Sequence, residues 1–146
     1  MTTPSLRLPE RCVSFTLDRE CFGVDVLQVR EVLNRPDMTS VPGAGTACVG
    51  VINLRGRILT VLDLRLLLGL SSSTIDDSEH LLVIERAGRM VGLIVDSVGD
   101  VINLNPNADT TTRTSGSVHP DAMTMVHHGD CFVALLNLDH ILENAA

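Results

Sequence analysis

The side chains of this chain that could act on a metal or a substrate are few and scattered. Only one cluster resembles a set of metal ligands, namely His119, His127, His128 and Cys131. Neighbouring residues of a strand point to opposite faces, so His127 and His128 are poorly placed to bind one ion. We interpret both as solvent-facing residues beside a turn at Gly129, and Cys131 as a small buried hydrophobe. No metal site is expected.

Catalytic motifs give no stronger signal. The sequence has no Gly-x-Ser-x-Gly elbow, no phosphate-binding glycine loop and no His-Glu-x-x-His pair. Asp63 could serve as a general acid, but it precedes a short apolar run, as Asn137 does, and both are better explained as helix N-caps. Asp96 follows an apolar run and is expected to cap a helix or turn the chain. We therefore expect neither enzymatic activity nor a cofactor.

The most informative polar residues lie in the segment Gly50–Gly56. If the apolar residues of this segment face a core, strand alternation turns Asn53 and Arg55 outward. Gly50 would leave backbone open to close approach, and Gly56 permits a tight turn. Arg55 offers a rigid fork of donors for carboxylates or backbone carbonyls. The segment is either a binding hairpin or an ordinary hairpin with an exposed arginine.

Bulk properties limit the class of protein. The chain has 146 residues, 45% of them hydrophobic, which is enough for a packed core. No apolar run approaches the ~20 residues that span a bilayer, and Met1–Arg11 lacks the apolar stretch of a signal peptide. We expect a cytoplasmic protein without membrane insertion. The cysteines form no CxxC pair and are expected to be buried free thiols, at Cys12, Cys21, Cys48 and Cys131.

The charge of the chain is distributed unevenly. The net charge is −7, and all basic residues are arginine. Residues 1–75 hold eight arginines and seven acids, whereas residues 76–146 hold three arginines and eleven acids. This acidity, with no Trp or Tyr, argues against nucleic-acid binding. The asymmetry indicates either two halves with different partners or one solvated acidic face.

Apolar alternation predicts a hairpin near the start of the chain. Its strands are Val13–Leu17 and Phe22–Val26, joined by a turn at 18–20. The spacing then changes to that of a helix of at most two turns, over Val26, Val29, Val32 and Leu33. The same pattern recurs 69 residues later without a gap, with strands at 82–86 and 90–95.

A second pair of segments is also similar. Residues 52–64 resemble 124–138, with one extra residue in the later copy that a β-bulge could absorb. Gly69 is expected to stop a helix. A repeat of about 70 residues that contains hairpins predicts two small β-barrels, related by a pseudo-two-fold and sharing a core. The polar stretches 71–79 and 105–117 are expected to be surface links.

The central segment also resembles a known family. Residues 50–65, Gly-Val-Ile-Asn-Leu-Arg-Gly-Arg-Ile-Leu-Thr-Val-Leu-Asp-Leu-Arg, are similar to the signature of CheW-domain proteins, the coupling proteins of bacterial chemotaxis. Further similar segments are Phe15–Leu17, Phe22–Val26, Val29–Val32 and Val91–Val98. The resemblance extends from about Cys12 to Leu142.

The resemblance implies a mainly β fold of two small five-stranded SH3-like β-barrels related by a pseudo-two-fold, with short helices. It implies one domain over 12–142, built from two intertwined barrels with a boundary near 70–80, between short tails at 1–11 and 143–146. It also implies a non-enzymatic adaptor that couples a CheA-type histidine kinase, through that kinase's CheW-like regulatory domain, to the cytoplasmic tips of chemoreceptors in membrane arrays.

Site residues follow from the resemblance as well. The receptor-facing positions of the family correspond to Val29, Glu31, Gly50 and Arg55, and the residues that shape the hairpin correspond to Asn53 and Gly56. Kinase contacts map only to the ends of the barrels. Thr60 stands where the family usually has proline, and it restores a backbone donor that a strand tolerates.

Three other functions compete with this one. The closest is an adaptor of the same type in a non-flagellar pathway, such as gliding or pilus motility. A small-barrel nucleic-acid-binding module is a distant second, since the acidic half and the lack of stacking aromatics disfavour it. A metal enzyme that uses the histidine cluster is the third.

Overall fold

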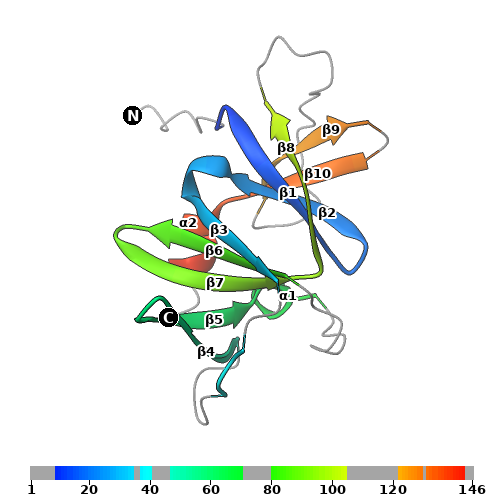
Figure 1. The fold of residues 1–146 in the computed structure, drawn as a ribbon. Helices are drawn as coiled ribbons and strands as arrows, with labels where there is room; N and C mark the ends of the chain where they lie inside the picture. The colour runs from blue at the N-terminus through cyan, green and yellow to red at the C-terminus, as the bar shows by residue number, and fades with distance from the viewer. Residues whose placement is uncertain are drawn as a thin grey trace.

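The computed structural model describes residues 9–34, 37–40, 47–70, 80–104, 122–129 and 131–143, and every structural statement below refers to these residues. They form ten strands and three short helices (Figure 1). In chain order the elements are β1 (Arg11–Leu17), β2 (Glu20–Asp25), the 3-10 helix η1 (Val26–Gln28), β3 (Val29–Asn34), β4 (Cys48–Leu54), β5 (Arg57–Asp63), α1 (Leu64–Leu67), β6 (His80–Arg86), β7 (Arg89–Val95), β8 (Ser97–Asn103), β9 (Ala122–His128), β10 (Cys131–Leu136) and α2 (Leu138–Glu143).

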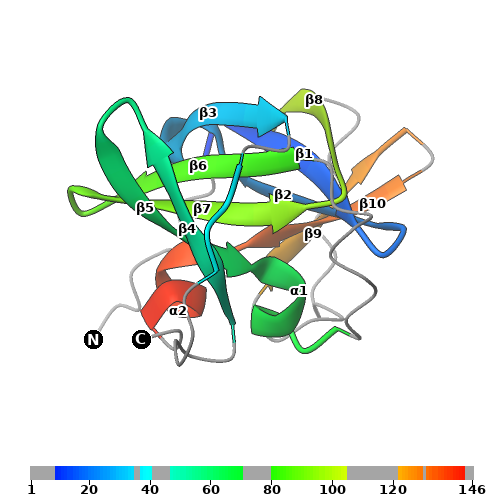
Figure 2. The same ribbon diagram turned by 60° about the horizontal axis from the view of Figure 1, so that its bottom comes forward.

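The strands form two five-stranded sheets that lie side by side (Figures 1 and 2). The first sheet has the order β8-β1-β2-β10-β9, and the second has the order β3-β6-β7-β5-β4. In each sheet one pair is parallel, β2 with β10 and β5 with β7, and the other pairs are antiparallel. We call them the first and the second barrel. The predicted mainly β fold is confirmed.

The predicted repeat is visible in the strand boundaries. Adding 69 to the bounds of β1 gives those of β6, and the same offset moves the start of β2 to the start of β7. The third strand of each copy is exchanged, because β3 pairs with β6 and β8 pairs with β1. Each barrel therefore contains strands from both halves of the chain, and chain order differs from barrel order.

The helix predicted over residues 26–33 is wrong. Only η1 is helical, a single turn in which the Leu27 amide donates to the Asp25 carboxylate at 2.9 Å. Residues 29–34 form β3, whose side chains are alternately half-buried and exposed. Pairing with β6 satisfies the backbone of this segment, and its β-branched valines favour a strand. The alternation of burial, rather than the helical spacing, decides its structure.

The prediction of an extra residue in the later hairpin is also wrong. Two residues separate β4 from β5, and two residues separate β9 from β10. One offset of 74 relates the hairpins, so that the pair Ile52 and Leu59 corresponds to the pair Val126 and Val133. Both hairpins carry a register shift at equivalent places, after Cys48 and before Leu136. The bulge thus belongs to both copies of the repeat.

The predicted helix caps are confirmed. The buried Asp63 carboxylate accepts a hydrogen bond from the Arg65 amide at 3.0 Å, at the start of α1. The Asn137 side chain accepts one from the His140 amide at 3.3 Å, at the start of α2. After α1, Gly69 adopts a φ of +74°, as expected of a residue that ends a helix. In each copy of the repeat the helix follows the last strand, α1 after β5 and α2 after β10.

The largest buried cluster is shared by the two barrels. It joins Phe15 and Phe22, whose rings stack with centroids 6.0 Å apart, to Leu82 and Leu93 of the other sheet. Each such side chain contributes roughly 1.5–3 kcal/mol by leaving water. Two smaller clusters fill the separate barrels, one around Val133 and one around the residues of β4, β5 and β6. The core expected across the junction is therefore present.

Candidate functional site

The hairpin between β4 and β5 presents Arg55 at its tip. Arg55 has a φ of +51° and Gly56 a φ of +85°, which is the left-handed conformation that a two-residue hairpin turn requires at both central positions. The Asn53 side-chain oxygen accepts a hydrogen bond from the Gly56 amide at 2.9 Å. Asn53 and Gly56 thus fix the turn, and the Arg55 side chain projects from it with 68% of its surface exposed.

Arg55 forms an ion pair with Glu31 of β3. The two residues come from the opposite edges of the second sheet, whose order begins with β3 and ends with β4. The pair therefore lies where the sheet curls round to bring its edges together, and it unites two residues that the sequence places 24 positions apart. Exposed ion pairs contribute about 1 kcal/mol at most, so the stability of the barrel depends little on this contact.

Gly50 is not open to an approaching partner, and that expectation is corrected. The residue is buried, and a Cβ atom there would lie 2.4 Å from the Thr39 carbonyl oxygen and 2.9 Å from the Met38 side chain. Thr39 and Val51 exchange two backbone hydrogen bonds, of 2.9 and 2.8 Å. The close approach that needs glycine is made by the chain itself. Gly50 thus allows the Thr39 segment to pair with the hairpin strand β4.

Val29 lies at the start of β3, opposite Ile84 of β6. Its side chain is half-buried and packs against the shared core. A register irregularity separates it from Glu31, two residues further along the strand. Of the six residues expected at the receptor-facing site, Glu31, Asn53, Arg55 and Gly56 therefore gather at one edge of the second barrel. Val29 packs against the shared core, and Gly50 is buried behind the hairpin.

A buried ion pair between Arg65 and Asp96 was not predicted. The Arg65 side chain is 2% exposed and pairs with the Asp96 carboxylate at the corner between β7 and β8. The same carboxylate accepts a hydrogen bond from the Asp18 amide at 2.7 Å, and the Asp96 amide donates to the Thr16 carbonyl at 3.0 Å. Asp96 thus turns the chain, as expected, and also connects α1 to the first barrel. Because arginine is almost never fully buried, its position could not be read from the sequence.

The histidine cluster is only partly as expected. His127 is half-buried, and its ring lies 4.9 Å from that of Phe132, so it does not face open solvent. Cys131 is exposed rather than buried and stands opposite His128, whose half-buried ring has its Nδ1 atom without a hydrogen-bond partner. His119 lies outside the described residues. Within the described residues, no three His, Cys, Asp or Glu side chains are placed to hold a metal ion.

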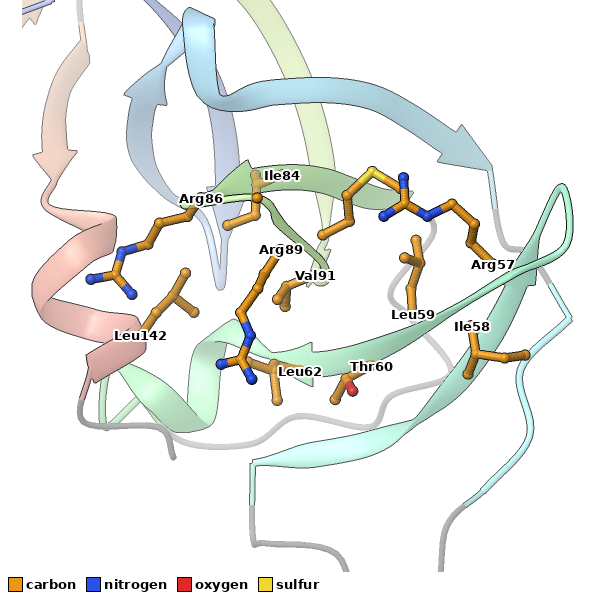
Figure 3. A pocket seen from close by; sticks show the side chains of 12 residues that line it. Arg57, Ile58, Leu59, Thr60, Leu62, Ile84, Arg86, Arg89, Val91 and Leu142 are labelled. Atoms are coloured by element: carbon orange, nitrogen blue, oxygen red, sulfur yellow. The ribbon is translucent and has the colours of Figure 1, made fainter.

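A cleft of about 540 Å³ opens at the end of the second barrel, between β5, the β6–β7 turn and α2 (Figure 3). Apolar side chains line its interior, and guanidinium groups stand around it, from Arg57, Arg86 and Arg89. Arg86 is paired with Asp139 at 2.6 Å. Among the residues that the structure describes, Arg57 and Arg89 have no ion-pair partner. Thr60, the residue at which the family resemblance predicts proline, is exposed in the wall of this cleft.

The first barrel has a cleft at the equivalent place. Its volume is about 480 Å³, and it is lined by residues at the start of β2 and β10 and by Leu70 after α1. The offset of 74 relates Ile58 beside the larger cleft to Phe132 beside the smaller one, and these side chains are 66% and 55% exposed. The two barrels therefore present similar apolar ends, and only the second is bordered by several arginines.

Comparisons with known proteins agree with this architecture. The family model described as "CheW-like domain" matches residues 11–146. The chemotaxis protein CheW of Thermotoga maritima is 30% identical over 131 residues, which cover 90% of this chain and 86% of that protein. CheW of Klebsiella aerogenes is 34% identical over 90 residues, 62% of this chain and 54% of that protein. The chain thus spans about half the length of some relatives.

One further relative and one solved structure are informative. Protein PilI of Pseudomonas aeruginosa is 37% identical over 86 residues, 59% of this chain and 48% of that protein. The crystal structure of the scaffolding protein TtCheW from Thermoanaerobacter tengcongensis superposes with a TM-score of 0.78 at 28% identity, covering 95% of this chain and 97% of that one. Among the helices that the structure describes, none is long and apolar enough to span a bilayer. The match over residues 11–146 shows that the chain belongs to the CheW-like domain family.

Proposed function

We propose that this chain is a non-enzymatic adaptor that couples a CheA-type histidine kinase to the cytoplasmic tips of chemoreceptors. The observation that carries the proposal is the family match, which extends through both barrels from residue 11 to residue 146. The relatives are named chemotaxis proteins, and the similar solved structure is named a scaffolding protein. We further propose that residues 12–142 act as one domain, in the cytoplasm and recruited to membrane receptor arrays.

The receptor-facing surface is proposed to be the edge of the second barrel formed by Glu31, Asn53, Arg55 and Gly56. The repeat supports this choice, because the offsets of 69 and 74 put Asp100 at the position of Glu31 and Gly129 at that of Arg55. The first barrel is thus built without this ion pair. A guanidinium on a rigid turn, paired with a carboxylate on strand β3, can recognise a polar partner side chain with little loss of entropy. Gly50 supports the hairpin through its close contact with the Thr39 backbone.

The kinase-facing surface is proposed to lie at the barrel ends, where the two equivalent clefts open. Large apolar side chains stand exposed there in both barrels, at Ile58 and Phe132. Such residues beside a concave surface are typical of protein contacts. The arginines around the second cleft would favour an acidic partner segment on that side (Figure 3). The regulatory domain of the kinase, itself CheW-like in this family, is the partner we propose.

A charge reversal at Arg55 tests the receptor-facing surface. The Arg55→Glu variant places a second carboxylate beside that of Glu31, and binding to receptor signalling domains should fall at least about 10-fold. Binding to a CheA-type kinase should change less than about twofold. The matched control is Arg11→Glu, an exposed arginine at the start of β1 in the other barrel.

Co-sedimentation with receptor-bearing vesicles and a kinase pull-down provide the two measurements. Receptor binding that survives Arg55→Glu would show that the surface is misplaced. If the unmodified chain bound neither a CheA-type kinase nor a receptor, the adaptor function itself would be refuted.

A related function in pilus or gliding motility is the second candidate. The observation in its favour is the 37% identity to PilI of Pseudomonas aeruginosa over 86 residues. The same surfaces would be used, with a different kinase and receptor. Competition between flagellar and pilus-type kinases for the purified chain would separate the two, since the cognate kinase should bind at least about 10-fold more tightly.

A further inference from the structure

Two cysteines that are 110 residues apart in the sequence meet in the first barrel. Strand β10 lies parallel to β2, with Val133 opposite Cys21. Cys131 is two positions before Val133 and therefore points to the same face of the sheet as Cys21. Both thiols are free, and burial together with the nearby Cys131 thiol raises the pKa of Cys21.

The pair is accessible from outside. Cys131 is exposed, Cys21 is half-buried, and both line the cleft of about 480 Å³ at the end of the first barrel. Cys12 in the same barrel differs, since it is completely buried. A small oxidant can therefore reach Cys131 directly, and the Cys21 thiol lines the same cleft.

The fold does not require cysteines at these places. Offsets of 74 and 69 carry Cys131 to Arg57 and Cys21 to Met90 in the second barrel. The register agrees, since Ala134 opposite Phe22 corresponds to Thr60 opposite Val91. The same parallel pairing is thus made once with two thiols and once with an arginine and a methionine. The thiols are a particular feature of the first barrel.

We propose that Cys21 and Cys131 form a reversible disulfide when the protein meets a hydroperoxide. The Cys131 sulfur attacks the peroxide oxygen, the O–O bond breaks, and a sulfenic acid and one water or alcohol result. The Cys21 sulfur then attacks the sulfenic sulfur, the S–S bond forms, and a second water leaves. The two thiols lose two electrons to the peroxide, and a dithiol reductant returns them.

The surroundings of the thiols fix their order of reaction. Burial, followed by the hydrogen bond and the charge of Cys131, raises the pKa of the Cys21 thiol. A raised pKa keeps Cys21 protonated and slows its own attack on peroxide. Cys131, being the exposed partner, is the site of first oxidation, and Cys21 resolves it.

The disulfide would join β2 from the first half of the chain to β10 from the second half. It would close one end of the first barrel beside the exposed Phe132. Oxidation would therefore stiffen one of the two proposed kinase-facing ends. The oxidation chemistry itself does not depend on the proposed adaptor function, so it can be tested on the isolated chain.

The test is intact-mass analysis of the purified full chain after treatment with one equivalent of hydrogen peroxide. We expect the mass of two hydrogens to be lost, a linked peptide that contains Cys21 and Cys131, and recovery of the starting mass with dithiothreitol. The Tm should rise by several degrees on oxidation, because the bond closes a loop of more than 100 residues.

Serine variants separate the roles of the thiols. In Cys21→Ser, Cys131 should gain one oxygen and react with dimedone, without any loss of hydrogens. In Cys131→Ser, neither the disulfide nor a dimedone-reactive sulfenic acid should form at one equivalent of peroxide. The matched control is Cys48→Ser, which removes a half-buried cysteine of the second barrel and should leave the Cys21–Cys131 bond unchanged.

Three results would overturn the proposal. One is a disulfide that links any other pair of cysteines in the treated chain. Another is the absence of a disulfide while Cys131 is oxidised beyond the sulfenic acid. The third is a stoichiometric metal ion, held by the two thiols with the neighbouring His128, that protects both from peroxide.

Discussion

Burial is the main determinant of the chemistry of Cys12. This residue is 0% exposed and belongs to the cluster that fills the first barrel. Burial, and secondarily the charge of Asp25, raises its pKa to about 11. The thiolate is therefore suppressed at neutral pH, and Cys12 behaves as a small hydrophobe. Cys131 in the same barrel is exposed and reactive in our proposal, so exposure and not residue type separates the two.

The raised pKa of Cys12 predicts that the protein loses stability in alkaline solution. In the unfolded chain the thiol has its ordinary pKa of 9.0, so on raising the pH the unfolded chain releases the proton first. The contribution is complete below pH 9 and is lost between about pH 9 and 11. The loss amounts to about 3 kcal/mol. Urea denaturation across this range measures it.

The composition of the chain means that a loss of stability between pH 9 and 11 reports mainly on cysteines. The chain contains no tyrosine and all its basic residues are arginine, so few groups other than cysteines titrate between pH 9 and 11. Cys12→Ala serves as the control and should flatten most of the profile, although its stability at neutral pH is lower. A wild-type stability that stays constant up to pH 11 would contradict the prediction.

At the scale of the elements, the β4–β5 hairpin depends on two glycines for different reasons. At Gly50 the Thr39 backbone occupies the place of a side chain, whereas at Gly56 nothing lies within 4 Å and only the positive φ favours glycine. Gly50→Ala should destabilise the protein by roughly 3 kcal/mol, at the upper end of the range for overpacking, because backbone must move. Gly56→Ala should cost about 1 kcal/mol through strain. Chemical denaturation gives both values.

Hydrogen exchange distinguishes the two variants further. In Gly50→Ala the amides of Thr39 and Val51 should lose protection, since their mutual hydrogen bonds are displaced. In Gly56→Ala they should stay protected. Equal losses of stability with unchanged protection of Thr39 would refute the supporting role assigned to Gly50.

The elements that could be predicted from the sequence are those with strong local patterns. Alternation in 13–17 and its recurrence 69 residues later gave the hairpins, and Asp63 before an apolar run gave the cap. The segment of β3 is predicted as a helix because Val29 and Val32 have helical spacing, whereas pairing with β6 makes it a strand in which these two residues face opposite sides. Short apolar segments are ambiguous for this reason.

The candidate site was predicted in part. Arg55 and Asn53 were recognised on a hairpin by alternation, and the turn geometry agrees. Their proximity to Glu31 came only through family resemblance, since it results from the closing of a sheet whose edge strands are far apart in sequence. The contact of Gly50 with Thr39 and the placement of Cys21 and Cys131 on one face of the first sheet are likewise non-local, and no spacing in the chain encodes them.

At the scale of the whole molecule, the exchange of third strands makes the two barrels interdependent. The first barrel takes β1 and β2 from one half of the chain and β8, β9 and β10 from the other, and the second barrel does the converse. The shared core joins residues of both sheets, and the Arg65–Asp96 ion pair also connects the halves. The two proposed partner surfaces are therefore held at fixed positions by one interdependent unit, which suits an adaptor.

This interdependence predicts that neither half folds alone. Cutting the chain between residues 75 and 76 leaves one fragment with β1 to β5 and another with β6 to β10. Each fragment lacks strands of both barrels and half of the shared core, so each alone should show the circular dichroism of an unfolded chain. Mixed in equal amounts, they should recover the β signal with a dissociation constant that rises on Leu93→Ala, because Leu93 is fully buried in the shared core. Cooperative unfolding of either fragment by itself would mean that its five strands form a folded unit without exchanging β3 or β8 with the other half. The two proposed surfaces would then be joined only by the chain between the halves, and not by a shared core.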